Sequence, residues 1–108
     1  MKLNKDMNIL IVGLGLLGGS YAKALTDKGY NVSAITKLQD SVDFAVENSM
    51  IAKGTTIVND DTVGNADLII FALYPTVFID WIEKNQRYIK KGAIITDVTA
   101  AFEGNRGL

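Results

Sequence analysis

Residues 9–18 read Ile-Leu-Ile-Val-Gly-Leu-Gly-Leu-Leu-Gly, and this stretch decides the fold. An apolar run that ends in glycine is typical of a strand buried on both faces of a parallel sheet. Helical spacing follows from about Leu16 to Lys28, with Gly29 as the stop and a predicted buried face of Leu17, Tyr21, Ala24 and Leu25. The sequence therefore predicts a buried strand, Asn8 to Val12, that enters a helix through glycines.

The glycines of this stretch have the spacing G-x-G-x-x-G. Gly13 would permit a tight turn, Gly15 would let the backbone approach a pyrophosphate, and Gly18 would let the helix pack closely on the sheet. We expect the amides of Leu16 and Leu17 to face phosphate oxygens, which the positive end of the helix dipole attracts. The strand-to-helix context makes the motif a candidate dinucleotide fingerprint. The alternative is a tight turn without a ligand.

The rest of the chain alternates between strands and helices. Four further strands are predicted over residues 31–35, 55–58, 68–73 and 93–98. This alternation predicts an α/β fold, a doubly wound parallel sheet of Rossmann type, for which we expect the strand order 3-2-1-4-5.

Two further helices are predicted between these strands. The first is capped by Asp40-Ser41 and should bury Val42, Ala45 and Val46. The second ends near Lys90-Lys91-Gly92, pairs Glu83 with Arg87, and should bury Val77 or Phe78, Trp81, Ile82 and Ile89.

The residues after the second strand bear on the choice of nucleotide. In NAD enzymes an acid at this point binds the ribose 2′-hydroxyl, whereas a 2′-phosphate favours hydroxyl and cationic donors. Thr36 and Lys37 stand there, with Gln39 near, so we expect NADP to be favoured over NAD. The missing acid also disfavours a methyltransferase that uses a related turn. The alternative for Lys37 is an ordinary solvated surface charge.

Two more loops are predicted walls of the cofactor site. Leu73, Tyr74 and Pro75 follow the fourth strand, and Thr99 closes the Thr-Asp-Val-Thr turn after the fifth. Tyr74 could instead seal the strand end, and Asp97 could brace the backbone after it.

Composition narrows the class of function. The 108 residues suit a single domain over residues 1–99, followed by an aperiodic tail over 100–108. A net charge of −1 with scattered basic residues suggests neither nucleic acid nor membrane as a partner, and no apolar run is long enough to span a membrane. With no cysteine and no histidine, we expect no metal site. We expect a cytoplasmic protein whose partner is a small-molecule dinucleotide.

Three segments together resemble prephenate and arogenate dehydrogenases. They are residues 11–20 with the double glycine and serine, residues 66–75 around the fourth strand, and residues 92–99 with the Thr-Asp-Val turn. The resemblance implies a nicotinamide-binding domain of an enzyme that oxidatively decarboxylates prephenate or arogenate on the way to tyrosine. It also implies a histidine-bearing segment and a helical substrate and dimerisation domain after the fifth strand.

The chain departs from that family after residue 99. Ala100 stands where many members have serine, Phe102 stands where lysine is expected, and no histidine follows. A base for the ring hydroxyl is therefore missing, and neither Arg87 nor Arg106 is well placed to clamp a dicarboxylate. We assign no catalytic residue and expect the chain to bind cofactor without turning over prephenate alone.

Two alternatives stay open on the same residues. One is a free-standing dinucleotide-sensing module that regulates a partner, although such modules usually carry an acid where Thr36 stands. The other is the cofactor domain of a different NAD(P)-dependent reductase. In the truncated-domain interpretation, the surface that the helical domain would cover favours self-association.

Overall fold

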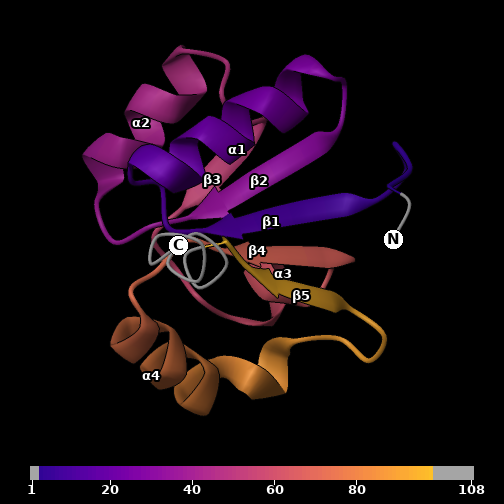
Figure 1. Ribbon diagram of the computed structural model, residues 1–108, viewed down its shortest axis with the longest axis vertical. Coiled ribbons are helices and arrows are strands. Elements are labelled where there is room, and N and C mark those ends of the chain that lie inside the picture. The colour runs from indigo at the N-terminus through magenta and orange to yellow at the C-terminus, as the bar shows by residue number, and fades with distance from the viewer. Residues whose placement is uncertain (1–2, 99–108) are drawn as a thin grey trace, which may run out of the picture.

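The computed structural model describes residues 3–98, which form one parallel sheet with helices on both faces (Figure 1). The strands, in the order β3-β2-β1-β4-β5, are β1 (Asn8–Val12), β2 (Asn31–Ile35), β3 (Lys53–Thr55), β4 (Leu68–Phe71) and β5 (Ile94–Asp97). The helices are α1 (Leu16–Asp27), α2 (Gln39–Glu47), α3 (Asp60–Val63), α4 (Pro75–Asn85) and the 3₁₀ turn η1 (Gln86–Tyr88). This confirms the predicted doubly wound order, and no second, helical domain lies within residues 3–98.

The core lies on both faces of the central strands. All four residues of β4 and the last four of β1 are buried, as the continuous apolar runs predict. Helices α1 and α2 cover one face, and α4 packs on the other (Figure 1). Phe71 of β4 meets Phe78 and Trp81 of α4 edge-on, with ring centroids 4.8 and 5.0 Å apart. Phe78, Trp81 and Ile82 thus form the predicted inward face of α4. They are half-buried rather than buried, and Ile89 packs on the same core from outside the helix, after η1.

The predicted buried face of α1 is partly wrong. Tyr21 and Ala24 are exposed, and the buried residues are Gly18, Gly19 and Ala22. The helix packs with its smallest residues inward, which brings its backbone close to the sheet. Leu17 and Leu25 border that face and are half-buried.

The second helix also differs from the prediction. It begins at Gln39 with Leu38 at the N-cap, and no side chain caps it, so Asp40 and Ser41 lie inside the first turn. Val42 and Ala45 are buried as predicted, but Val46 is exposed because the inward stripe of this nine-residue helix is narrow.

The segment before β4 was predicted incorrectly. The third strand is Lys53–Thr55, not residues 55–58, and Ile57 is exposed after the chain leaves the sheet. A one-turn helix, α3, follows unpredicted, and its start is fixed by a capping box in which Asn59 and Thr62 each bind the other's backbone amide at 3.0 Å.

The last elements are shorter than expected. The strands β4 and β5 end one to two residues before the predicted ends, and α4 ends at Asn85 before η1. Arg87 does not pair with Glu83; it donates to the carbonyl of Lys84 and to the hydroxyl of Tyr88. At the open edge of the sheet, Ile94 and Ile95 of β5 are 40% and 43% exposed. None of the helices in residues 3–98 has the length and apolar character needed to cross a membrane.

Candidate functional site

Three of the predicted loops meet at the carboxyl edge of the sheet. The register pairs Val12 with Ile35 on one side and with Phe71 on the other, so the loops after β1, β2 and β4 leave the sheet at one level. Backbone hydrogen bonds hold them there: the amide of Gly13 donates to Ile35 at 2.8 Å, and that of Ala72 donates to Val12 at 2.9 Å. The strand order reverses beside β1: β2 and β3 are added on one side of β1, and β4 and β5 on the other. Doubly wound folds bind their ligands at this switch point, outside the carboxyl ends of the strands.

Gly13 and Gly18 fix the shape of the turn after β1. Gly13 has a φ of +97°, and a Cβ there would lie 2.6 Å from the carbonyl oxygen of Ala72. A Cβ on Gly18 would lie 2.0 Å from the carbonyl oxygen of Gly13. Both contacts are with backbone, so only glycine allows the loop and the first turn of α1 to approach this closely. The packing roles predicted for these two glycines fit the geometry.

Gly15, at the start of α1, borders space that no atom of residues 3–98 fills. It is the N-cap, and a Cβ built on it would meet no atom within 4 Å. Among residues 3–98, the amides of Leu16, Leu17 and Gly18 donate to no backbone acceptor, and no acidic side chain occupies the first turn. Unpaired amides at the positive end of a twelve-residue helix attract an anion.

Thr36 and Lys37 follow β2 beside this loop. The Thr36 side chain is half-buried, and its amide donates to the carbonyl of Thr55 at 3.1 Å. Lys37 is exposed and forms no ion pair within the described part of the chain. Its ammonium is therefore available to an anionic ligand.

The loop after β4 supplies the opposite side of the site. Leu73 packs into the core on the α4 side, with its Cδ2 3.0 Å from where a Cβ of Gly13 would lie. Tyr74 is the N-cap of α4, and its side chain is 75% exposed. Pro75 occupies the first turn of α4, where its missing amide costs no hydrogen bond. Thr99, Arg106 and the predicted tail lie outside the described residues.

A groove of about 940 Å³ runs from the glycine loop between α1 and α2. Gly15, Leu16 and Ser20 line it from one side, and Asp40 and Phe44 line it from the other. The sequence prediction missed Asp40 because it looked for an acid at the end of the second strand and treated Asp40 as a helix cap.

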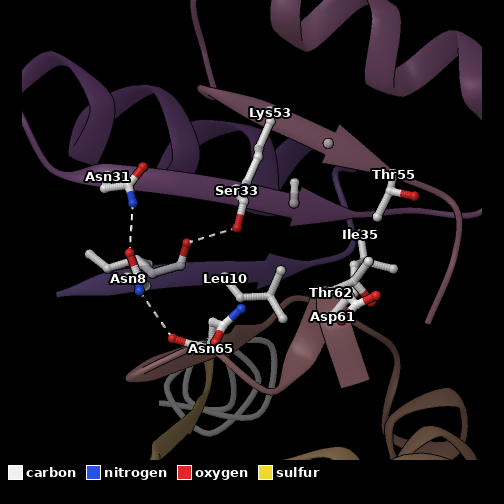
Figure 2. Close-up of a pocket in the computed structure, with 14 residues that line it drawn as sticks. Asn8, Leu10, Asn31, Ser33, Ile35, Lys53, Thr55, Asp61, Thr62 and Asn65 are labelled. Carbon is white, nitrogen blue, oxygen red and sulfur yellow. Dashed lines mark hydrogen bonds between the residues drawn. The ribbon is translucent and has the colours of Figure 1, made fainter. Parts of the chain in front are cut away.

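A second hollow, of about 290 Å³, lies on the other face of the sheet, beside α3 (Figure 2). Asn31 donates to Asn8 at 2.7 Å, Asn8 donates to the carbonyl of Asn65 at 3.2 Å, and Ser33 lies beside them. No residue of the glycine loop lines this hollow. The hollow is separate from the candidate site.

At the opposite, amino edge of the sheet, the carboxylate of Asp67 has a structural role. Asp67 accepts a hydrogen bond from the amide of Asn8 at 2.7 Å and pairs with the ammonium of Lys90. The Asn8 hydrogen bond first, and then Lys90, hold the pKa of Asp67 below its usual value, against a smaller opposing effect of burial. No group of acidic side chains in residues 3–98 is arranged to hold a metal ion.

Comparison with known proteins identifies the class of this site. Residues 8–101 match the family described as NADP oxidoreductase, coenzyme F420-dependent. The T-protein of Haemophilus influenzae is 27% identical over 100 residues, which are 91% of this chain and 22% of that protein.

Two solved structures share the fold and part of the sequence. Synechocystis arogenate dehydrogenase superposes with a TM-score of 0.78 at 26% identity, and the match covers 84% of this chain and 32% of that one. Prephenate dehydrogenase from A. aeolicus, in complex with hydroxyphenyl propionate and NAD⁺, gives 0.76 at 28% identity with the same coverage.

The chain thus spans about a third of the length of these solved relatives. The NAD⁺ bound in the A. aeolicus structure, together with the family match, supports binding of a nicotinamide dinucleotide. The chain belongs to the NADP oxidoreductase, coenzyme F420-dependent family, and it is homologous to the dinucleotide-binding domain of prephenate and arogenate dehydrogenases.

Proposed function

We propose that the carboxyl edge of the sheet binds a nicotinamide dinucleotide, with its pyrophosphate against the amides of Leu16 and Leu17. The observation that carries this proposal is that no side chain of residues 3–98 caps the first turn of α1 and that the space beside the N-cap residue, Gly15, is open. The nucleotide would supply hydride transfer, and the chain's own part is to hold and orient it between the glycine loop, Leu73, Tyr74 and Pro75. We keep Thr99 as a further predicted contact.

The test is calorimetric titration of the chain with NAD and NADP beside a Gly15→Ala variant. Gly15 has a φ of −63°, which alanine adopts freely, so the variant should fold normally. Its methyl group would stand where the pyrophosphate approaches, and we expect affinity for both nucleotides to fall at least tenfold. Unchanged affinity in the variant would show that the ligand binds elsewhere.

The finer proposal is that NADP binds more tightly than NAD. The hydroxyl of the half-buried residue Thr36 and the ammonium of Lys37, unpaired within residues 3–98, support it, because both groups suit a 2′-phosphate. Lys37→Gln should weaken NADP binding about fivefold and leave NAD binding within about twofold, the usual scale for one exposed charge on a phosphate. Equal loss for both nucleotides would remove Lys37 from the 2′-phosphate site.

We propose that the chain alone does not oxidise prephenate or arogenate. Substrate turnover needs an acceptor for the hydroxyl proton, and the chain has no histidine. Its Arg87 lies in η1, where its guanidinium donates to the carbonyl of Lys84 and to the hydroxyl of Tyr88. Formation of reduced nucleotide with either substrate, monitored at 340 nm, would contradict this proposal.

We also propose that the exposed β5 edge makes the chain self-associate, as unpaired apolar edge strands do. Ile94 and Ile95 project from β5 on opposite faces, and β5 pairs only with β4 among the described strands. Ile95→Lys should lower the sedimentation coefficient to that of a monomer, whereas Ile57→Lys, at a somewhat more exposed site off the sheet, should not. A wild-type chain that sediments as a monomer would contradict this proposal.

The cytoplasmic location of the protein stays a prediction.

A further inference from the structure

The carboxylate of Asp40 is an unassigned charge beside the proposed nucleotide site. It lies in the first turn of α2 and lines the groove that begins at Gly15 and Leu16. Within residues 3–98 it forms no hydrogen bond or ion pair. Asp43, three residues along the same helix, does not line the groove and accepts a hydrogen bond from Gln39 at 2.9 Å.

We infer that Asp40 is a specificity-determining residue that opposes Lys37: it accepts a hydrogen bond from an adenosine ribose hydroxyl and repels a 2′-phosphate. This inference rests on the proposed dinucleotide site. A carboxylate next to this ribose favours NAD over NADP, and the usual position for it, directly after the second strand, is Thr36 in this chain. Asp40 instead presents a carboxylate from the next helix, α2, to the groove that begins at Gly15 and Leu16, a groove that Thr36 itself does not line.

The charges of Lys37 and Asp40 should have opposite effects on the preference for NADP over NAD. Lys37 lies between β2 and α2 and Asp40 lies one turn further on, yet they form no ion pair with each other. Each is therefore free to act on a ligand. The chain should bind both nucleotides, and the ratio of the two affinities is set by this pair of side chains rather than by either one.

A purely structural role for Asp40 makes a different prediction. An acidic side chain in the first turn stabilises a helix through its dipole. If that were its whole role, Asp40→Asn would lower the thermal stability of the chain and leave the ratio of the NADP and NAD dissociation constants unchanged.

The experiment measures both dissociation constants by calorimetry for the wild type, Asp40→Asn, Lys37→Gln and the double variant. Asp43→Asn is the matched control, since it removes the same charge from the same helix outside the groove. We expect Asp40→Asn to shift the ratio toward NADP about fivefold, the scale of one surface charge facing a phosphate, and the shift should shrink as salt rises. Lys37→Gln should shift it the other way, and the double variant should return near the wild-type ratio.

Competition with adenosine 2′,5′-bisphosphate and with 5′-AMP tests whether Asp40 acts on the 2′-phosphate, since only the bisphosphate carries that group. Asp40→Asn should improve binding of the bisphosphate and not of 5′-AMP. An equal shift in Asp43→Asn, or no shift in Asp40→Asn while both nucleotides still bind, overturns the inference and leaves the proposed function standing. Binding of neither nucleotide to the wild type overturns both.

Discussion

Replacing Gly18 with alanine tests the close packing of α1 on the glycine loop. Two effects of opposite sign compete. Alanine is favoured over glycine inside a helix by about 1 kcal/mol. Against this, the new Cβ would lie 2.0 Å from the carbonyl oxygen of Gly13 and 3.1 Å from the Cβ of Ala72. The first contact is more than ~1 Å inside ordinary packing distance, and neither neighbour can rotate away.

The clash should win. Forcing extra carbon into a packed site costs about 1–3 kcal/mol, and the upper end applies here because backbone must move. The net expectation for Gly18→Ala is about 2 kcal/mol of lost unfolding free energy, or a melting temperature lower by about 10 °C in a domain of this size. Gly19→Ala is the matched control, because it has the same helix propensity gain and its nearest contact is the flexible methyl of Met50 at 3.1 Å, with the carbonyl oxygen of Leu14 at an ordinary 3.7 Å.

The assay is urea unfolding followed by circular dichroism for the wild type and both variants. We expect Gly19→Ala to remain within about 1 kcal/mol of the wild type. If Gly18→Ala were as stable as Gly19→Ala, the glycine loop and α1 would not be packed as described, and Gly18 would not be required for that packing.

Three further outcomes are expected. Asn59→Ala should cost about 1 kcal/mol in urea unfolding, because it removes the side chain that caps α3; an unchanged midpoint would mean that α3 is not held by its cap. Trp81→Ala should cost about 3 kcal/mol in urea unfolding followed by circular dichroism, since it removes the ring that meets Phe71 edge-on, and a loss below ~1 kcal/mol would contradict that packing. Because the pKa of Asp67 is lowered in the folded chain, its carboxylate stabilises the fold at pH values above the ordinary carboxyl pKa, and this stabilisation is lost as the pH falls through the lowered pKa. When the pH is lowered from about 6 to about 2, the unfolding free energy of Asp67→Asn should therefore fall less than that of the wild type.

The sequence was a good guide wherever apolar pattern and glycine spacing agreed. The strand at Asn8–Val12 and its neighbour at Asn31–Ile35 were predicted to the residue, and the alternation of strands and helices led us to expect the doubly wound strand order that is observed. The convergence of the glycine loop with the loops after β2 and β4 was predicted for the same reason. Contacts of these residues with a ligand stay predictions.

Elements whose signal is weak or indirect were missed. The helix α3 has one turn and no apolar period, and its signal was the Asn59 to Thr62 spacing of a capping box. The strand β3 contains a lysine and a glycine, which disfavour strands, and it forms because it pairs with β2. The face of α1 was misjudged because a pattern of large apolar residues gives no weight to glycines that pack inward.

The pairing of β1 with both β2 and β4 has a consequence for folding. Val12 pairs with Ile35, near it in the chain, and with Phe71, far from it. Closing the longer chain loop is slower and costs more entropy, so the wall of the site at Leu73 and Tyr74 forms only when nearly the whole domain is in place. A dinucleotide that needs all three loops would bind the complete fold and not a partly folded chain. The cell's own nucleotide pool would then act as a folding ligand and protect the chain from proteolysis in proportion to its occupancy.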